Sequence, residues 1–526
     1  MDKITNYIYK NIFYLMFNKN NNFINGFISA FILQKAYSII LKSYSRFNLI
    51  DLLRIIPSVN KKVTNKLKET YQTIQDDINK VDSEYKEIKK LENSKTEEQI
   101  ENKINTMKTI EWQNGKISGI VYHGEDKYRD FLLSIFKKYA WSNPLHPDLF
   151  PEIRNMEIDI INMTINMFDG DDNCCGNVTY GGTESILLAC KTYRDWGYQK
   201  KGITKPNIVI LESGHAAFNK AGDYFGIEIK TVPIDLDTGT SSIHLINKYV
   251  DWNTVCIVGS APSYAHGIID NIDLMASYAK SKNIGFHLDC CMGGFLVPFL
   301  FPSISFKIEG ITSISADTHK YGYTFKGSSV ILYNSVELKN YQHFSKIDWN
   351  GGIYATPTLM GSKSGALIAT TWAAMMYHGK NKYTEIAQNI NKMTLKIIDK
   401  TSNIKGIKII GQPYLNIIAY QSDGVDIYQV ASKMKEKGWD LSIMQNPASF
   451  HICITKLHLN NDLADIFATN LRKSVLQVQQ ENNPELKGTV AIYGMASTIN
   501  QPSLVQEVTN SYLNLLSKKE IVISYG

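Results

Sequence analysis

Strand-like and helical segments alternate between residues 180 and 335 of this 526-residue chain, and this alternation limits the fold more than any other feature. The strand-like runs are 207–211, 228–233, 254–260, 284–288, 311–315 and 328–333, and the helical stretches include 182–197 and 273–282. Such an alternation predicts an α/β fold in which a mostly parallel sheet carries helices on both faces. Open sheets of this kind bind ligands beyond the carboxyl ends of their strands, so we expect functional residues there.

Polar residues follow or end three of these strand-like runs. His215 follows the run 207–211, Asp289 follows directly on 284–288, and Lys320 comes shortly after 311–315. Lysine readily forms a Schiff base with an aldehyde, and a buried aspartate is costly unless it meets a cation or several donors. A lone lysine in a loop is usually a surface residue, so the three positions carry weight only together.

A glycine-rich turn precedes the helical stretch that begins near residue 182. Gly181 and Gly182 allow the backbone to approach a ligand closely, and Thr183 offers a hydroxyl beside the free amides at the start of the helix. These groups suit a phosphate. Many helices begin in this way without binding anything, so the turn alone is a weak signal.

The four features in this order match the needs of pyridoxal 5′-phosphate. Its phosphate needs helix-terminal amides and hydroxyls, and its aldehyde needs a lysine. Its ring nitrogen needs an acid, and its ring face needs a flat group. The sequence therefore predicts a pyridoxal-phosphate enzyme with Lys320 at its centre.

Several longer stretches carry a resemblance to a known family. They are 141–151, 178–196, 214–221, 287–299, 313–329, 348–365 and 492–498. From about residue 110 to its end, the chain resembles the sphingosine-1-phosphate lyases, in the group II decarboxylase branch of the fold-type I pyridoxal-phosphate enzymes. The fold class implied is transferase-like, with a smaller C-terminal α+β domain and an N-terminal helical or membrane segment.

The resemblance also implies the site residues. Cofactor binding is expected from Lys320, Asp289, His215, Thr183, His319 and Gly352. Lys320, which binds the cofactor aldehyde, is expected to act with Lys326 and Tyr122 as the catalytic set, and substrate binding is expected from Asn143, His146, Tyr354 and Tyr493. No metal is expected. The chain departs from the family at Lys363, where we expect an arginine; lysine lacks the bidentate phosphate geometry of arginine.

The activity implied is cleavage of the C2–C3 bond of sphingoid base 1-phosphates into a long-chain aldehyde and phosphoethanolamine. The family also implies a homodimer with shared active sites, anchored in the endoplasmic reticulum membrane with its catalytic part in the cytosol. Two alternatives remain open at this point. One is a pyridoxal-phosphate amino-acid decarboxylase, which would need a carboxylate-binding arginine, and the other is an inactive cofactor-binding scaffold.

Four regions are expected along the chain. Residues 1–57 hold a candidate membrane anchor at 23–41, which is about the right length but carries Gln34 and Lys35 near its middle. The alternative is an amphipathic helix that lies at the membrane surface or binds a partner. Residues 58–110 predict a charged helical linker, 111–365 the large cofactor-binding domain, and 366–526 a helical connection and the small C-terminal domain.

Composition limits the remaining partners. The chain is 44% hydrophobic and 20% charged with a formal net charge of +6, as in an ordinary globular protein. No basic stretch alternates with aromatic residues, so we expect no nucleic-acid partner. The seven cysteines are odd in number, begin after residue 150 and lack zinc-ligand spacing, which predicts reduced thiols.

Overall fold

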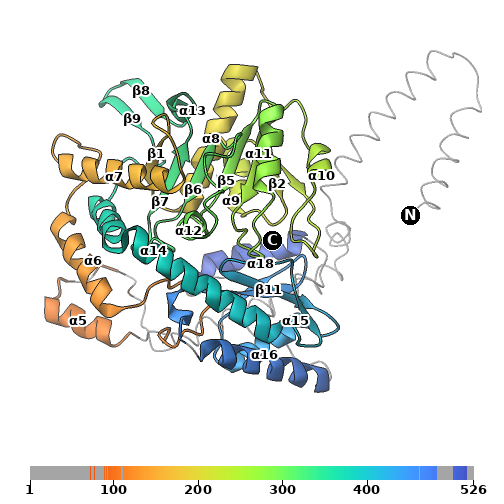
Figure 1. Ribbon diagram of the computed structural model, residues 1–526. Helices are drawn as coiled ribbons and strands as arrows, with labels where there is room; N and C mark the ends of the chain where they lie inside the picture. Colours follow the sequence, from red (N-terminus) through yellow and green to blue (C-terminus); the bar gives the residue numbers. More distant parts are fainter. Residues whose placement is uncertain are drawn as a thin grey trace, which may run out of the picture. The chain divides into compact units, whose positions relative to one another are not determined.

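The computed structural model (Figure 1) describes residues 93–107, 111–460, 462–481 and 502–517, with a few single positions between 65 and 91. The chain divides into two compact units, residues 109–493 and residues 1–108 with 494–526. In the second of these, the described helices are α5 (Glu97–Asn105) and α18 (Pro502–Leu515). None of the helices in the described ranges is both long and apolar enough to span a bilayer. The candidate anchor at 23–41 lies outside those ranges.

A seven-stranded sheet forms the centre of the unit 109–493. Its strands are β1 (Cys175–Thr179), β2 (Asn207–Leu211), β3 (Glu228–Val232), β4 (Thr254–Ser260), β5 (Gly285–Asp289), β6 (Ser313–Ala316) and β7 (Ser329–Tyr333). They lie in the order β1-β7-β6-β5-β4-β2-β3, and only β7 runs antiparallel to its neighbours. The predicted mostly parallel sheet is therefore confirmed. β7 is reversed because the segment 317–328 contains no crossover helix, and parallel strands need one.

Alternate residues of the buried strands feed two apolar clusters, one on each face of the sheet. In β2, Ile208 and Ile210 join one cluster while Val209 and Leu211 join the other. The first cluster is covered by α8 (Gly182–Lys201) and α9 (Ala217–Phe225). The second contains residues of α6 (Asp126–Tyr139), α7 (Pro151–Met167), α11 (Ile272–Ser281) and α12 (Val297–Leu300).

The long helix α14 (Gly365–Thr401) packs against α6, α7 and α16 (Leu463–Gln480) (Figure 1). Its path breaks at Gly379, whose φ of 54° is a left-handed conformation that glycine adopts without strain. The sequence predicts two helices, 366–378 and 380–402, on either side of this residue. The break therefore lies where the pattern placed the end of the first helix.

A second, antiparallel sheet follows α14, with the order β10-β11-β13-β12. Its strands are β10 (Ile407–Ile409), β11 (Ile417–Ser422), β12 (Ser442–Met444) and β13 (Ser449–Cys453). Helices α15 (Ile427–Glu436) and α16 (Leu463–Gln480) pack beside it. The domain boundaries at 57, 110 and 365 stay predictions.

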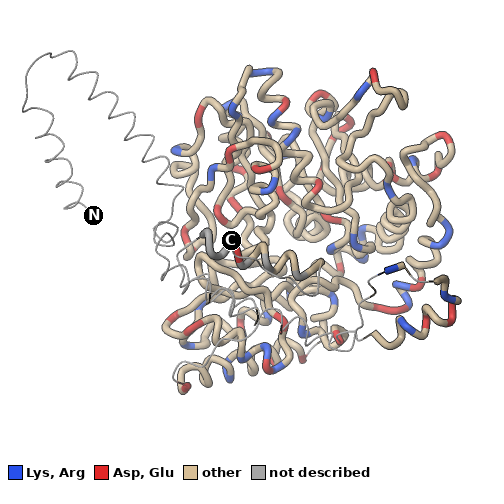
Figure 2. The backbone as a smooth tube through the Cα atoms, turned by 180° about the vertical axis from the view of Figure 1, so that it is seen from behind, with Lys and Arg blue, Asp and Glu red and all other residues tan. Residues whose placement is uncertain are grey.

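A separate hairpin, β8 (Phe344–Trp349) and β9 (Gly352–Thr356), leaves both strands largely exposed. The remaining short helices are α10 (Ile243–Asn247), α13 (Val336–Asn340) and the 3₁₀ turn Lys456–His458. Figure 2 shows that basic and acidic residues are interspersed along the described chain.

Candidate active site

A cavity of about 580 Å³ opens at the carboxyl edge of the central sheet. Most of its walls come from the segments that follow β1, β2, β5 and β6, as expected for a ligand site in such a sheet, and Leu359 and Met360, which follow β9 (Gly352–Thr356), complete them. Four of the predicted cofactor-binding residues, Thr183, His215, His319 and Lys320, line this cavity together.

Lys320 is held in the cavity by a buried ion pair. Its Nζ lies 3.0 Å from Oδ2 of Asp317, a residue whose side chain is 2% exposed. Burial alone would lower the pKa of Lys320, but Asp317, with Cys291 and Tyr122, raises it above its ordinary value. Conversely, burial would raise the pKa of Asp317, but the charges of Lys320 and His319 hold it below the usual range. The ammonium and carboxylate forms therefore stabilise each other.

His319 lies beside this pair and is fixed by the backbone. Its Nδ1 lies 2.6 Å from the carbonyl oxygen of Ser328, to which it donates, and its Nε2 lies 3.6 Å from Oδ2 of Asp317. Burial lowers the pKa of His319, while Asp317 opposes this effect. The ring is thus oriented toward the cavity before any ligand is present.

The start of α8 forms the part of the wall next to this ion pair. The helix begins at Gly182, and no side chain caps its first amides. A Cβ atom on Gly182 would lie 2.8 Å from both Oδ1 of Asp317 and Sγ of Cys291, so only glycine fits between the helix and the ion pair. Thr183 is exposed to the cavity, and Oδ1 of Asp317 is buried without a hydrogen-bond partner. The uncapped amides and the Thr183 hydroxyl are donors that suit a phosphate group.

Asp289 and His215 complete the predicted cofactor set. Asp289 is 6% exposed, does not line the cavity itself, and accepts hydrogen bonds at Oδ1 from the backbone N–H of Cys291 (3.0 Å) and from Ser315 Oγ (3.3 Å). Cys291 does line the cavity, so the carboxylate lies directly behind its wall. His215 accepts a hydrogen bond at Nδ1 from the N–H of Ala217 (3.1 Å), which orients its ring.

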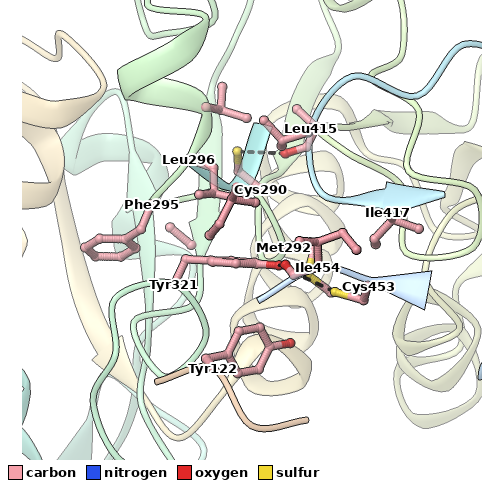
Figure 3. Packing of buried hydrophobic residues seen from close by; sticks show 14 of the residues in the cluster. Tyr122, Cys290, Met292, Phe295, Leu296, Tyr321, Leu415, Ile417, Cys453 and Ile454 are labelled. Atoms are coloured by element: carbon pink, nitrogen blue, oxygen red, sulfur yellow. Dashed lines mark hydrogen bonds between the residues drawn. The ribbon is translucent and has the colours of Figure 1, made fainter. Parts of the chain in front are cut away.

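Tyr122 and Lys326 pair with each other near Lys320, whose charge acts on both, but neither of them lines the cavity. Nζ of Lys326 lies 4.5 Å from the centre of the Tyr122 ring, and that ring meets Tyr321 edge-on at 5.0 Å (Figure 3). Burial and then the charge of Lys320 lower the pKa of Lys326 to about 8. Burial and then Cys453 raise the pKa of the Tyr122 phenol above its ordinary value, against the charge of Lys320.

Among the described residues, none of the predicted substrate-binding residues lines this cavity. Asn143 contacts the segment before α14, donating to Ser362 Oγ (3.2 Å) and accepting from the N–H of Lys363 (3.3 Å). His146 is exposed beside it. Gly352, one of the predicted cofactor residues, and Tyr354 lie on the hairpin β8–β9, and Tyr493 lies outside the described residues.

Comparison with known proteins identifies the family. Residues 135–421 match the family model described as the pyridoxal-dependent decarboxylase conserved domain. Sphingosine-1-phosphate lyase 1 of Rattus norvegicus is 40% identical over 485 residues, covering 90% of this chain and 85% of the rat protein. The sphingosine-1-phosphate lyase of Saccharomyces cerevisiae is 34% identical over 89% of this chain and 82% of its own length. The chain belongs to the sphingosine-1-phosphate lyase family.

A solved structure agrees with this assignment. The sphingosine-1-phosphate lyase of Burkholderia pseudomallei matches with a TM-score of 0.76 at 31% identity, covering 83% of this chain and 98% of that chain. The predicted cofactor, pyridoxal 5′-phosphate, is confirmed by the family model and these relatives. The cavity fits it, because a lysine, a buried carboxylate and an uncapped helix start meet there.

Lys363, the departure from the family pattern, is used inside the fold. Its Nζ lies 2.8 Å from Oε1 of Glu157 and 3.4 Å from the carbonyl oxygen of Val178, and both charged side chains are mostly buried. Lys363 therefore ties the segment before α14 to α7 and β1. It does not line the cavity.

Asp317 and Lys220 are among the lining residues that escaped the sequence prediction. Asp317 lies three residues before Lys320 in the sequence, and this spacing is a usable signal. Lys220 lines the cavity from α9, with its Nζ 5.3 Å from the centre of the Tyr224 ring. It lies on the helix that begins two residues after His215, and this proximity was its only sign in the sequence.

Proposed function

We propose that this chain is a pyridoxal-phosphate lyase that cleaves the C2–C3 bond of sphingoid base 1-phosphates, releasing a long-chain aldehyde and phosphoethanolamine. The observation that carries the proposal is the buried Lys320–Asp317 pair in the cavity at the sheet edge. A second support is that the relatives covering most of this chain carry the name sphingosine-1-phosphate lyase.

Each predicted residue has a place in this proposal. Lys320 would hold the cofactor covalently at its aldehyde carbon, Asp289 would face its ring nitrogen, and His215 would face its ring. Thr183 and His319, with the amides at the start of α8, would hold the phosphate. When bound, the cofactor supplies an electron sink for the bond that is broken.

Lys326 and Tyr122 are proposed for the proton transfers. A lysine with a pKa of about 8 is partly neutral near pH 7.5 and can take the proton of the C3 hydroxyl at its Nζ. The C3 carbon then becomes the aldehyde carbon, and the electron pair of the C2–C3 bond stays with C2, which is protonated later. The phenol of Tyr122 keeps its proton, since its pKa is raised, and is suited to donate a hydrogen bond.

The hairpin β8–β9 supports a homodimer with shared active sites. Ile347, Trp349 and Ile353 on this hairpin are 76%, 55% and 77% exposed, and an isolated two-stranded hairpin is marginally stable in water. We propose that a second copy covers it, and that Gly352 and Tyr354, with Asn143 and His146, complete the partner's site. Light scattering of the Ile353→Asp variant is expected to give a monomer without lyase activity. A fully active dimer would contradict this arrangement.

Residues 1–57 are proposed to attach the protein to the endoplasmic reticulum membrane, with the catalytic unit facing the cytosol. The support is the apolar run 23–41 followed by Lys42, Arg46 and Arg54. Alkaline extraction of membranes from cells that express the full chain distinguishes an integral anchor, which stays in the pellet, from a surface helix, which is released.

The activity itself is tested with purified protein, pyridoxal phosphate and a phosphorylated sphingoid base, with products identified by mass spectrometry. Long-chain aldehyde and phosphoethanolamine are expected, and both should disappear in Lys320→Ala. Carbon dioxide from an amino-acid panel, without aldehyde from the lipid, would replace the proposal by a decarboxylase. Neither product from a cofactor-loaded protein would indicate a scaffold.

A further inference from the structure

A chain of buried polar side chains leads away from Asp289 between β5 and β6. Ser315 Oγ lies 3.3 Å from Oδ1 of Asp289 and 3.2 Å from Nε2 of His287. Nδ1 of His287 lies 2.7 Å from Ser313 Oγ, which in turn lies 2.6 Å from the phenol oxygen of Tyr193 on α8. All four of these partners are at most 1% exposed, so water does not replace these contacts.

The charge state of His287 limits how protons are arranged in this chain. Burial lowers the pKa of His287 to about 4, although the charge of Asp289 opposes the shift. At neutral pH the ring is therefore neutral and carries one N–H, so one ring nitrogen donates and the other accepts.

An ionised Asp289 then determines the direction of every hydrogen bond. A carboxylate only accepts, so Ser315 donates to it and must itself accept from Nε2–H of His287. Nδ1 is then the acceptor for the Ser313 hydroxyl, and Ser313 accepts from the Tyr193 phenol. Every donor along the chain points toward Asp289, an arrangement in which successive hydrogen bonds strengthen one another.

We propose that Ser315 and His287 are positioning residues that hold the Asp289 carboxylate oriented toward the ring nitrogen of the cofactor. The proposal rests on the role given to Asp289 in the proposed function. Among the described residues, Asp289 accepts only one backbone N–H and this one hydroxyl. The serine is therefore one of two groups that donate to the carboxylate, and the histidine supplies the N–H that the serine oxygen accepts.

A purely structural role is the alternative, because buried hydroxyl groups must find partners in any fold. The same helix α8 provides a matched control. Thr192 Oγ1 lies 3.0 Å from the phenol oxygen of Tyr333, and this buried pair has no hydrogen-bonded connection to Asp289 within the described residues. Loss of that pair affects packing alone.

The test uses the full chain as Ser315→Ala, Ser313→Ala and Tyr333→Phe, with the wild type beside them. For each protein we would measure the cofactor Kd by absorbance titration, the absorption maximum of the bound cofactor, and the Tm of the cofactor-free form. A hydrogen bond to a charged group is lost in Ser315→Ala, so we expect the Kd to rise roughly tenfold and the maximum to shift. Ser313→Ala should show a smaller effect in the same direction, and Tyr333→Phe should change only the Tm.

The outcomes separate the two proposals. If the wild type binds the cofactor and the cofactor Kd of both Ser315→Ala and Ser313→Ala stays within twofold of the wild-type value, this inference alone is overturned. A wild type that binds no cofactor would overturn the proposed function and this inference with it. If Ser315→Ala does not fold, an unchanged Kd and spectrum in Ser313→Ala overturns the inference, and a raised Kd with a shifted maximum supports it.

Discussion

Removal of the carboxylate beside Lys320 should destabilise the cofactor-free protein by several degrees. The pair is short, 3.0 Å, and mostly buried, with the Asp317 side chain 2% and the Lys320 side chain 19% exposed. Removing one partner of a buried pair costs about 3–5 kcal/mol, because the other charge is left without compensation. Because the Lys320 side chain is partly exposed, we expect Asp317→Asn to cost the lower value of this range, about 3 kcal/mol of unfolding free energy.

The expected change in Tm follows from the size of the unit. At about 2.1 cal/mol/K per residue, unfolding residues 109–493 gives roughly 1.2 °C per kcal/mol, so Asp317→Asn should lower the Tm by about 4 °C. The pair is fully formed above the ordinary aspartate pKa, about 3.9, and below the ordinary lysine pKa, about 10.4. This holds because the pKa of Asp317 is lowered and that of Lys320 is raised. Calorimetry at pH 7.5 therefore measures the whole effect.

A double-mutant cycle with Lys320→Met tests the reasoning. The double variant leaves no unpaired buried charge. Its loss in the free energy of unfolding should therefore be smaller than the sum of the two single-variant losses by at least about 2 kcal/mol. Glu337→Gln serves as the control, because its pair with Lys200 has both side chains at least half exposed and should shift the Tm by less than about 1 °C. Additive single losses would refute the idea that the two charges stabilise each other.

Three further predictions concern single residues. The kcat should rise with pH through about 8 as Lys326 loses its proton, and Lys326→Gln should lack this limb in initial rates measured from pH 6 to 9.5. Gly182→Ala places a methyl group 2.8 Å from the Asp317 carboxylate, so the cofactor Kd should rise at least roughly tenfold. In contrast, Gly202→Ala, with open space around it, should lower only the Tm. Lys363→Met should lower the Tm by about 3–4 °C by breaking a buried pair, whereas Lys363→Arg should keep it; equal losses would contradict this role.

The central sheet was predictable where burial is continuous. The runs 207–211 and 254–260 return as β2 and β4 with unchanged bounds, since strands buried on both faces consist almost entirely of apolar residues. β1 escaped prediction because CGNVT contains glycine and asparagine, which have low strand propensity, and the strand is defined by its pairing with β7. The hairpin β8–β9 escaped because every residue of β8 is exposed, so no apolar alternation marks it.

The cofactor cavity was predictable because topology alone collects its residues. Thr183, His215, His319 and Lys320 all follow strands whose carboxyl ends meet at one edge, so their order in the sequence sufficed. The pairing of Lys326 with Tyr122 was different, because it joins segments about 200 residues apart through side-chain packing. No local pattern encodes such a contact.

The chain of hydrogen bonds behind Asp289 was predictable only in part. Its polar residues recur with period two in the sequence, but the sequence does not say which strands are neighbours. His287 and Asp289 are two residues apart in β5, and Ser313 and Ser315 are two residues apart in β6, so each pair lies on one face of its strand. The register joins His287 to Ser313 and Asp289 to Ser315, while Leu288 and Ile314 face the opposite apolar cluster. Two polar pairs with period two in neighbouring buried strands therefore indicate a shared polar network, once the strand order is known.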